Sequence, residues 1–313
     1  MGRPSRVTYA DWRNLGNGRS TALLTNFWRG FLVFNIKGAG KRWILAGVGA
    51  ALTAGAACGA FALAGAANAD ASTAADKGKP TIVLEHGAFA DASSWNGVID
   101  RLRADGYPVV AAANPLRGPH NDATALRSLL DHVKGPKILV GHSYGGSVIS
   151  EAAANDSQVK GLVYVAAFLP APGETALELT NKYPGSTLRG ALDPVPFTAP
   201  DRTKGTDLYI QQDKFRHQFA ADVPRNQAAL AAATQRPIAQ AALEEKATIA
   251  AWKTIPSWDV ITTQDLNIPA SVQRFMAKRA HAHTTEVAAS HSVAISHPDV
   301  VTRVIEEAAR ATR

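Results

Sequence analysis

The sequence predicts an α/β fold, a mostly parallel, doubly wound sheet with a helical cap inserted into it. Short apolar runs alternate with helix-compatible runs over residues 80–166 and again over 257–309. This alternation is typical of a parallel sheet covered on both faces. One strand-to-helix junction holds the sequence Gly-His-Ser-Tyr-Gly at 141–145. Between the two alternating regions, residues from about 168 to 255 break the pattern, so we expect an insertion there.

Four strands are expected in the first half of the domain, each a short apolar or β-branched run that a turn ends. They lie at 81–85, 109–113, 137–140 and 159–166. Three helices follow the first three strands, at about 93–105, 122–133 and 143–154. The first two helices carry apolar residues at helical spacing, and Ser93 or Ser94 is the expected cap of the first one.

The insertion at about 168–255 contains no convincing core strand. We expect a proline-rich loop at 193–200 and helical segments near 206–220, 225–234 and 237–250. The alternation then resumes with strands at 257–263 and 284–287 and helices at 269–280 and 298–309.

Length and charge limit the classes of partner. The chain has 313 residues, 46% of them hydrophobic, which is enough for one large domain with a buried core. Its net charge of +7 arises entirely from residues 1–69, because residues 70–313 carry 25 Lys and Arg against 25 Asp and Glu. We therefore expect no nucleic-acid partner for the folded domain.

Residues 1–69 are typical of an N-terminal extension with a signal peptide. Basic residues between 37 and 42 precede an uncharged run at about 43–67, and Ala67-Asn68-Ala69 is a small-x-small cleavage site. We expect a secreted protein cleaved after Ala69. Because the run is also long enough to cross a bilayer, the alternative is a membrane anchor formed by residues 43–67.

The mature protein is expected to begin with a small, polar linker at 70–79, followed by the α/β domain at 80–313. The only cysteine, Cys58, lies in the segment to be removed. The mature domain then has no disulfide and depends on its hydrophobic core.

Ser143 lies at the centre of Gly141-His142-Ser143-Tyr144-Gly145, which fits the G-x-S-x-G pattern. In a nucleophile elbow the chain turns sharply from strand to helix and leaves the serine hydroxyl exposed. Glycines permit such a strained turn. The alternative is a glycine-rich turn with an incidental serine.

A serine nucleophile needs a base and a carboxylate that orients the base, and in this fold they follow in the order serine, acid, histidine. His291 lies in a loop of small residues after the last strand, where the base belongs. The other histidines after Ser143 are expected elsewhere: His217 in the insertion, His281 and His283 at a helix end, and His297 at a helix start.

For the acid we favour Asp265, which follows the carboxyl end of the strand at 257–263. Asp259 lies at the start of that strand and so at the wrong edge of the sheet. Glu286 is a third candidate, with a solvated strand position as its alternative.

Acyl transfer also needs hydrogen-bond donors for the developing oxyanion. One donor is expected to be the backbone N–H of Tyr144, which follows the nucleophile. The other is expected from the loop 86–89, with Ala88 favoured and Phe89 as the alternative; Phe89 is also expected to contact the substrate. No metal-ligand spacing recurs, and no cofactor is expected.

These residues together resemble the α/β-hydrolase superfamily, in the branch of plant methyl-ester esterases, hydroxynitrile lyases and their bacterial relatives. The resemblance covers residues 81–310 and implies a triad of Ser143, Asp265 and His291, oxyanion donors at Ala88 and Tyr144, and a cap that forms the acyl pocket. The matching stretches are His86-Gly87-Ala88 with Trp95, 141–146, 263–265, 268–269, 273–276, 290–293 and 296–298.

The chain departs from this branch at two points. Tyr144 stands where Leu or Met is common. The lyases carry a lysine near the triad, whereas Leu266 follows Asp265 here and no lysine occurs between Lys253 and Lys278. This difference disfavours lyase chemistry.

The residues thus predict a secreted serine hydrolase, a carboxylesterase acting on small or medium apolar esters through an acyl-enzyme on Ser143. Its expected partner is a small-molecule ester, with no stable membrane partner unless the segment 43–67 is retained. The alternatives are the same triad used for perhydrolysis, C–C or lactone hydrolysis, or a ligand-binding module without turnover.

Overall fold

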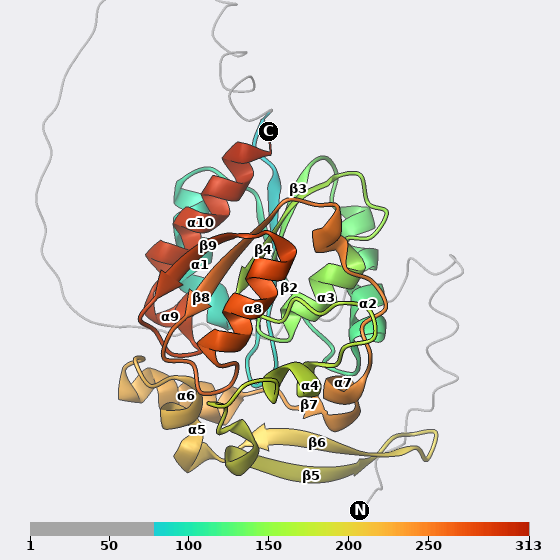
Figure 1. Cartoon of the computed structure of the whole chain (residues 1–313), viewed down its shortest axis with the longest axis vertical. Coiled ribbons are helices and arrows are strands. Elements are labelled where there is room, and N and C mark those ends of the chain that lie inside the picture. The colour runs from blue at the N-terminus through green and yellow to red at the C-terminus, as the bar shows by residue number, and fades with distance from the viewer. Residues whose placement is uncertain (1–77, 313) are drawn as a thin grey trace, which may run out of the picture. The chain divides into compact units, whose positions relative to one another are not determined.

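The domain is built on a six-stranded sheet in which every neighbouring pair of strands is parallel. The computed structural model describes residues 78–312, so the predicted signal peptide and most of the linker lie outside the described residues. The strand order is β2-β1-β3-β4-β8-β9 (Figure 1). The strands are β1 (Thr81–Glu85), β2 (Val109–Ala112), β3 (Lys137–His142), β4 (Val159–Val165), β8 (Ser257–Thr262) and β9 (His283–Val287).

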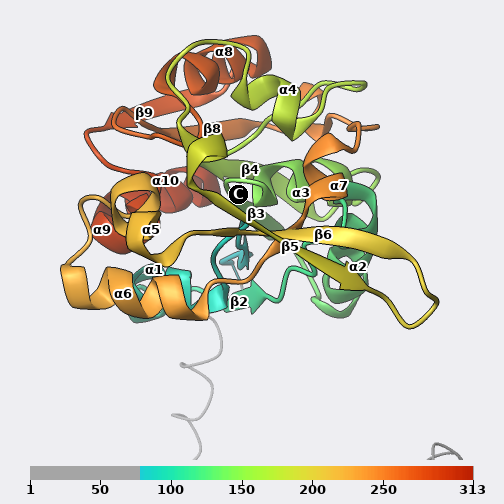
Figure 2. The same cartoon turned by 90° about the horizontal axis from the view of Figure 1, so that it is seen from below.

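Helices cover both faces of this sheet, which confirms the predicted fold class (Figures 1 and 2). One face packs against α1, α9 and α10, and the other against α2, α3 and α8. Side chains alternate between two hydrophobic clusters, with Ile82 in one and Val83 in the other. The helices are α1 (Asn96–Ala104), α2 (Pro119–His132), α3 (Gly145–Ala152), α8 (Ala270–Ala280), α9 (Val293–Ser296) and α10 (Pro298–Ala311).

Two helix starts differ from the sequence prediction. Helix α2 begins at Pro119 rather than near 122, because proline at a first helical position has its φ already set and needs no hydrogen-bond acceptor. A 3₁₀ helix, η2 (Ala92–Trp95), precedes α1, and its cap is Asp91 rather than Ser93 or Ser94. The Asp91 carboxylate accepts the Ser93 N–H at 2.7 Å.

The cap between β4 and β8 contains helices, as predicted, and also strands, which the sequence did not predict. It contains a three-stranded antiparallel sheet in the order β5-β6-β7. The segment 193–200, expected as a loop, lies mostly in β5, and 206–210, expected as helix, lies in β6. The cap elements are α4 (Ala176–Thr180), η3 (Leu188–Ala191), β5 (Leu192–Thr198), β6 (Lys204–Ile210), α5 (Gln212–Phe219), α6 (Arg225–Thr234), β7 (Ile238–Ala239), α7 (Gln240–Glu244) and η4 (Ala251–Lys253).

The prolines of β5 explain why the sequence predicts a loop rather than a strand at this position. Pro194 and Pro196 pair with Leu208 and Thr206 of β6, and β5 is an edge strand. An edge strand tolerates proline because the missing N–H can face away from the partner strand. Figure 2 shows the β5–β6 hairpin lying across the ends of the sheet strands.

The turn from β3 to α3 is made by Ser143, whose φ is +54°. Backbone segments approach one another closely around it. A Cβ atom on Gly141 would lie 2.7 Å from the carbonyl carbon of Gly145, and one on Gly87 would lie 2.7 Å from the His142 carbonyl oxygen. Glycine is therefore required at both positions, and the loop after β1 packs directly on the turn.

Asp259 lies inside strand β8, between Tyr164 of β4 and Thr284 of β9. Its side chain is fully buried, and neither carboxyl oxygen has a hydrogen-bond partner among residues 78–312. Burial raises the pKa of the Asp259 carboxyl well above its usual value, so the group is protonated in the folded state. Asp259 therefore belongs to the core.

Replacing Gly87 by Ala should lower the free energy of unfolding by about 1–3 kcal/mol, because the new methyl group overlaps the backbone of the turn. Urea denaturation measures the change. Gly190→Ala is the matched control, since nothing lies within 4 Å of its added Cβ, and it should change stability by no more than about 0.5 kcal/mol. Equal effects of the two substitutions would refute the close packing at Gly87.

Asp259→Asn should stabilise the protein more at pH 7 than at pH 4. As the pH rises above the ordinary aspartate pKa of about 4, the unfolded chain loses the Asp259 proton while the folded chain keeps it. This favours unfolding of the wild type, and the asparagine variant escapes that cost. Urea denaturation at both pH values measures the difference, with the exposed Asp213→Asn as control; a difference that does not grow with pH contradicts the assignment.

Candidate active site

Ser143, His291 and Asp265 form one chain of hydrogen bonds at the carboxyl ends of three strands. Ser143 lies between β3 and α3, Asp265 in the loop after β8, and His291 in the loop after β9. The Ser143 hydroxyl donates to His291 Nε2 at 2.8 Å, and His291 Nδ1–H donates to Asp265 Oδ2 at 2.6 Å. The His291 and Asp265 side chains are almost completely buried. The structure thus brings the three predicted residues together.

Asp265 is held by four further donors. Its Oδ1 accepts the backbone N–H groups of Asn267 at 2.7 Å and Ile268 at 3.0 Å. Its Oδ2 accepts the hydroxyl of Thr262 and the amide of Gln273, both at 3.0 Å. The carboxylate therefore has one orientation, which presents Oδ2 to His291 and fixes the tautomer with hydrogen on Nδ1.

His142 supports His291 through the backbone of His291. Its Nε2–H donates to the His291 carbonyl oxygen at 2.9 Å, and the two ring centroids are 4.8 Å apart. Burial, with a smaller contribution from His291, lowers the pKa of His142 to about 3. The His142 imidazole is therefore neutral and adds no positive charge beside His291.

Two backbone N–H groups are available for an oxyanion. The N–H groups of Ala88 and Tyr144 have no acceptor among the described residues, and both residues line the cavity at Ser143. The N–H of Phe89 donates to the Arg236 carbonyl oxygen at 3.0 Å, so Phe89 is wrong as the alternative donor.

The loop that carries Ala88 is fixed by His86. The His86 Nδ1–H donates to the Gly87 carbonyl oxygen at 2.9 Å, and Nε2 accepts the Asn114 N–H at 3.1 Å. Burial lowers the pKa of His86, which keeps the imidazole neutral and able to accept this bond. The Asn114 side chain also donates to the His86 carbonyl at 2.8 Å.

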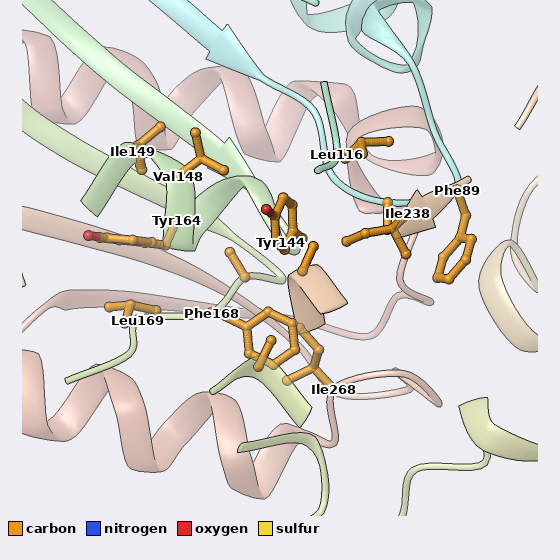
Figure 3. Close-up of a cluster of buried hydrophobic side chains, with 14 of the residues drawn as sticks. Phe89, Leu116, Tyr144, Val148, Ile149, Tyr164, Phe168, Leu169, Ile238 and Ile268 are labelled. Atoms are coloured by element: carbon orange, nitrogen blue, oxygen red, sulfur yellow. The ribbon is translucent and has the colours of Figure 1, made fainter. Parts of the chain in front are cut away.

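Tyr144 is anchored through its side chain. Its hydroxyl donates to Asp122 Oδ2 at 2.7 Å, and both residues are buried. Burial first, and then the charge of Asp122, raises the pKa of the Tyr144 phenol, so it stays a neutral donor. Figure 3 shows Tyr144 in the buried cluster, between Val148 of α3 and Ile238 of the cap. This anchor fixes the peptide that carries the Tyr144 N–H.

A cavity of about 720 Å³ opens at Ser143 and His291 and extends beneath the cap. Phe89 lines it, where the sequence placed a substrate contact, and packs edge-to-face on Phe219 at 6.2 Å. Most of the wall is apolar, and the cap supplies Leu177, Leu188, Leu192, Pro194, Leu208, Phe219 and Leu243.

The remaining candidates lie elsewhere in the described chain. Glu286 is exposed on β9 and forms an ion pair with Arg274 at 2.7 Å. Three histidines belong to the ends of elements: His281 ends α8, His283 begins β9 and His297 precedes α10. His217 lies in α5 of the cap, as expected.

Sequence reasoning missed the roles of Gln273 and His142. Gln273 is a fully buried polar side chain on the apolar face of α8, between Val272 and Met276. A polar residue on an otherwise apolar helix face was the available signal. Nothing in the sequence indicated that His142 would reach the His291 backbone.

Among residues 78–312, no helix is long and apolar enough to cross a membrane.

The chain is similar to known proteins in sequence and in fold. The Alpha/beta hydrolase family model matches residues 82–304. A pyrethroid hydrolase of Sphingobium wenxiniae is 28% identical over 257 residues, which cover 74% of this chain and 88% of that protein. Among the solved structures that share the fold are polyneuridine aldehyde esterase (TM-score 0.64, 17% identity, 73% of this chain and 98% of that one) and the Arabidopsis methylesterase MES16 (TM-score 0.62, 19% identity, 74% of this chain and 99% of that one).

The family match covers most of the chain and confirms the resemblance that the motifs indicate. Polyneuridine aldehyde esterase and the methylesterase MES16 show that this fold is shared with known proteins. The chain belongs to the alpha/beta hydrolase family.

Proposed function

We propose that the protein is a serine hydrolase that cleaves carboxylic esters through an acyl-enzyme on Ser143. The observation that carries the proposal is the hydrogen-bonded chain from Ser143 through His291 to Asp265. Beside it lie two backbone N–H groups, those of Ala88 and Tyr144, that have no acceptor among residues 78–312. Family membership and a relative named as a hydrolase support it.

In the proposed first step, Ser143 Oγ attacks the ester carbonyl carbon while its proton passes to His291 Nε2. Asp265 stabilises the imidazolium through the 2.6 Å hydrogen bond to Nδ1. The negative charge that develops on the carbonyl oxygen is stabilised by the N–H groups of Ala88 and Tyr144. The C–O bond of the ester then breaks, and the alcohol leaves with the proton from His291.

In the second step, water attacks the acyl carbon and gives a proton to the same Nε2. The acyl–Oγ bond breaks, the carboxylic acid leaves, and His291 returns the proton to Ser143. His142 and Gln273 take no proton in either step; they hold the His291 carbonyl and the Asp265 carboxylate in place.

The cavity supports an apolar, medium-sized ester as the substrate. Its volume of about 720 Å³ falls in the range of pockets that hold drug-sized ligands, and leucine side chains from the cap form much of the wall. Apolar surface of this kind binds alkyl chains through the hydrophobic effect.

We also propose that the protein is exported, with residues 43–67 as the apolar region of a cleaved signal peptide. Support comes from the sequence, which places basic residues before this region and Ala67-Asn68-Ala69 after it. Amino-terminal sequencing of protein from the culture medium should give a chain that starts at Asp70. An intact segment 43–67 in the membrane fraction would favour the anchor instead.

For p-nitrophenyl esters, kcat/KM should rise from acetate to hexanoate by up to about fourfold per methylene group, because each buried CH₂ contributes about 0.8 kcal/mol. Steady-state kinetics across the ester series measure this rise.

Ser143→Ala should lower kcat at least about 10⁴-fold and leave the unfolding midpoint nearly unchanged. Steady-state kinetics measure kcat, and thermal melts measure the unfolding midpoint.

Ser147→Ala is the matched control, because Ser147 is also buried on this stretch of chain but makes no side-chain hydrogen bond among the described residues. It should keep wild-type kcat. Ester turnover that survives in Ser143→Ala, or a wild type that binds esters without turnover, would refute the proposed function.

A further inference from the structure

The cap contacts both residues that flank His291. The contacts come from Phe219, the last residue of α5, and from Asp222, in the link between α5 and α6. Ser292 Oγ donates to the Phe219 carbonyl oxygen at 2.8 Å. Ser290 makes two bonds to Asp222: its N–H donates to Oδ2 at 3.1 Å, and its hydroxyl donates to Oδ1.

The sheet loops and the cap divide the task of holding His291. Its ring is bonded to Asp265 and Ser143, and its carbonyl accepts from His142. All three partners belong to the main sheet or to the loops at the carboxyl ends of its strands. The Ser290 N–H, one residue before His291, has Asp222 as its only acceptor among residues 78–312.

The Asp222 side chain is suited to this contact because a carboxylate offers two acceptor oxygens in a fixed fork. Burial opposes ionisation, but hydrogen bonds from Ser290 and Ser296 lower the pKa of Asp222 below its usual value. The titratable neighbour that faces it is His297, whose Nδ1 lies 3.7 Å from Oδ2. The carboxylate is therefore ionised, and charge-assisted bonds of this kind are stronger than neutral ones.

We propose that Asp222 is a positioning residue, through which the cap sets the place of His291 opposite Ser143. Asp222 touches neither the cavity wall nor the reacting atoms; it acts through Ser290 and the loop that carries the base. The inference rests on the proposed function, because it assigns the consequence of the contact to proton transfer by His291. If the inference holds, His291 is correctly placed only when the cap packs against the loop at 290–292.

The test compares kcat and KM for p-nitrophenyl hexanoate in the full chain. Asp222→Ala should lower kcat about 10- to 100-fold, the loss expected when a reacting group is displaced by about 1 Å, while KM changes no more than about twofold. Asp222→Asn keeps one acceptor oxygen and should lie between Asp222→Ala and the wild type. Ser290→Ala removes one of the two donors and should give a smaller loss in the same direction.

A second readout reports on the base directly. The rate at which a fluorophosphonate labels Ser143 depends on proton removal by His291, so it should fall in the Asp222 variants by about the same factor as kcat. Asp213→Ala in α5 is the matched control, since Asp213 is exposed, lies in the same part of the cap and, among residues 78–312, makes no hydrogen bond or ion pair with the loop at 290–292. It should keep wild-type kcat and labelling rate.

The outcomes separate the two proposals. If Asp222→Ala does not fold, the kcat values and labelling rates of Asp222→Asn and Ser290→Ala test the positioning role of Asp222 instead. The inference is overturned if kcat and labelling stay within about twofold of the wild type, or if the loss lies entirely in KM and the melting temperature, as for a purely structural contact. A wild type that is neither labelled nor active on esters overturns the proposed function, and this inference with it.

Discussion

The backbone conformation at Ser143 is the constraint on which the rest of the site depends. A φ of +54° is unfavourable for a residue with a Cβ atom, at a cost of order 1–3 kcal/mol, and it persists only where the surroundings enforce it. Here they do, because Gly87 and Gly141 let three backbone segments meet at the turn. The turn places Ser143 at the cavity, and the Tyr144 N–H that follows it has no acceptor within the described part of the chain. The same close packing brings the Ala88 loop beside it.

Around this turn, the environment of each carboxyl group decides its role. Asp265 accepts five hydrogen bonds, although its side chain is almost completely buried. Asp259, inside β8, has no hydrogen-bond partner among residues 78–312 and is protonated. Glu286 lies at the surface, paired with Arg274. Only the first of these arrangements can orient an imidazole and stabilise it when it gains a proton.

Much of the sheet and of the site could be predicted from the sequence, because both depend on local signals. Apolar runs of strand length locate β1, β3 and β4, and the order of serine, acid and histidine along the chain narrows the partners to a few loops. The β5–β6 hairpin could not be predicted in this way. Its prolines suggest a loop, and only the edge position in a small sheet makes them acceptable.

The supporting contacts could not be predicted either, because they join residues far apart in the chain. The bond from His142 to the His291 backbone spans 149 positions, and the one from Ser290 to Asp222 spans 68. No spacing or motif encodes such pairs. They form because the sheet places the loops at one edge and the cap closes over it, so the base is held by partners from both parts of the fold.

The most direct test of this account is a crystal structure of the protein after reaction with a fluorophosphonate. The account predicts a bond between phosphorus and Ser143 Oγ, with the phosphoryl oxygen about 2.7–3.1 Å from the backbone nitrogens of both Ala88 and Tyr144. An adduct on another residue, or a phosphoryl oxygen turned away from both N–H groups, would contradict it.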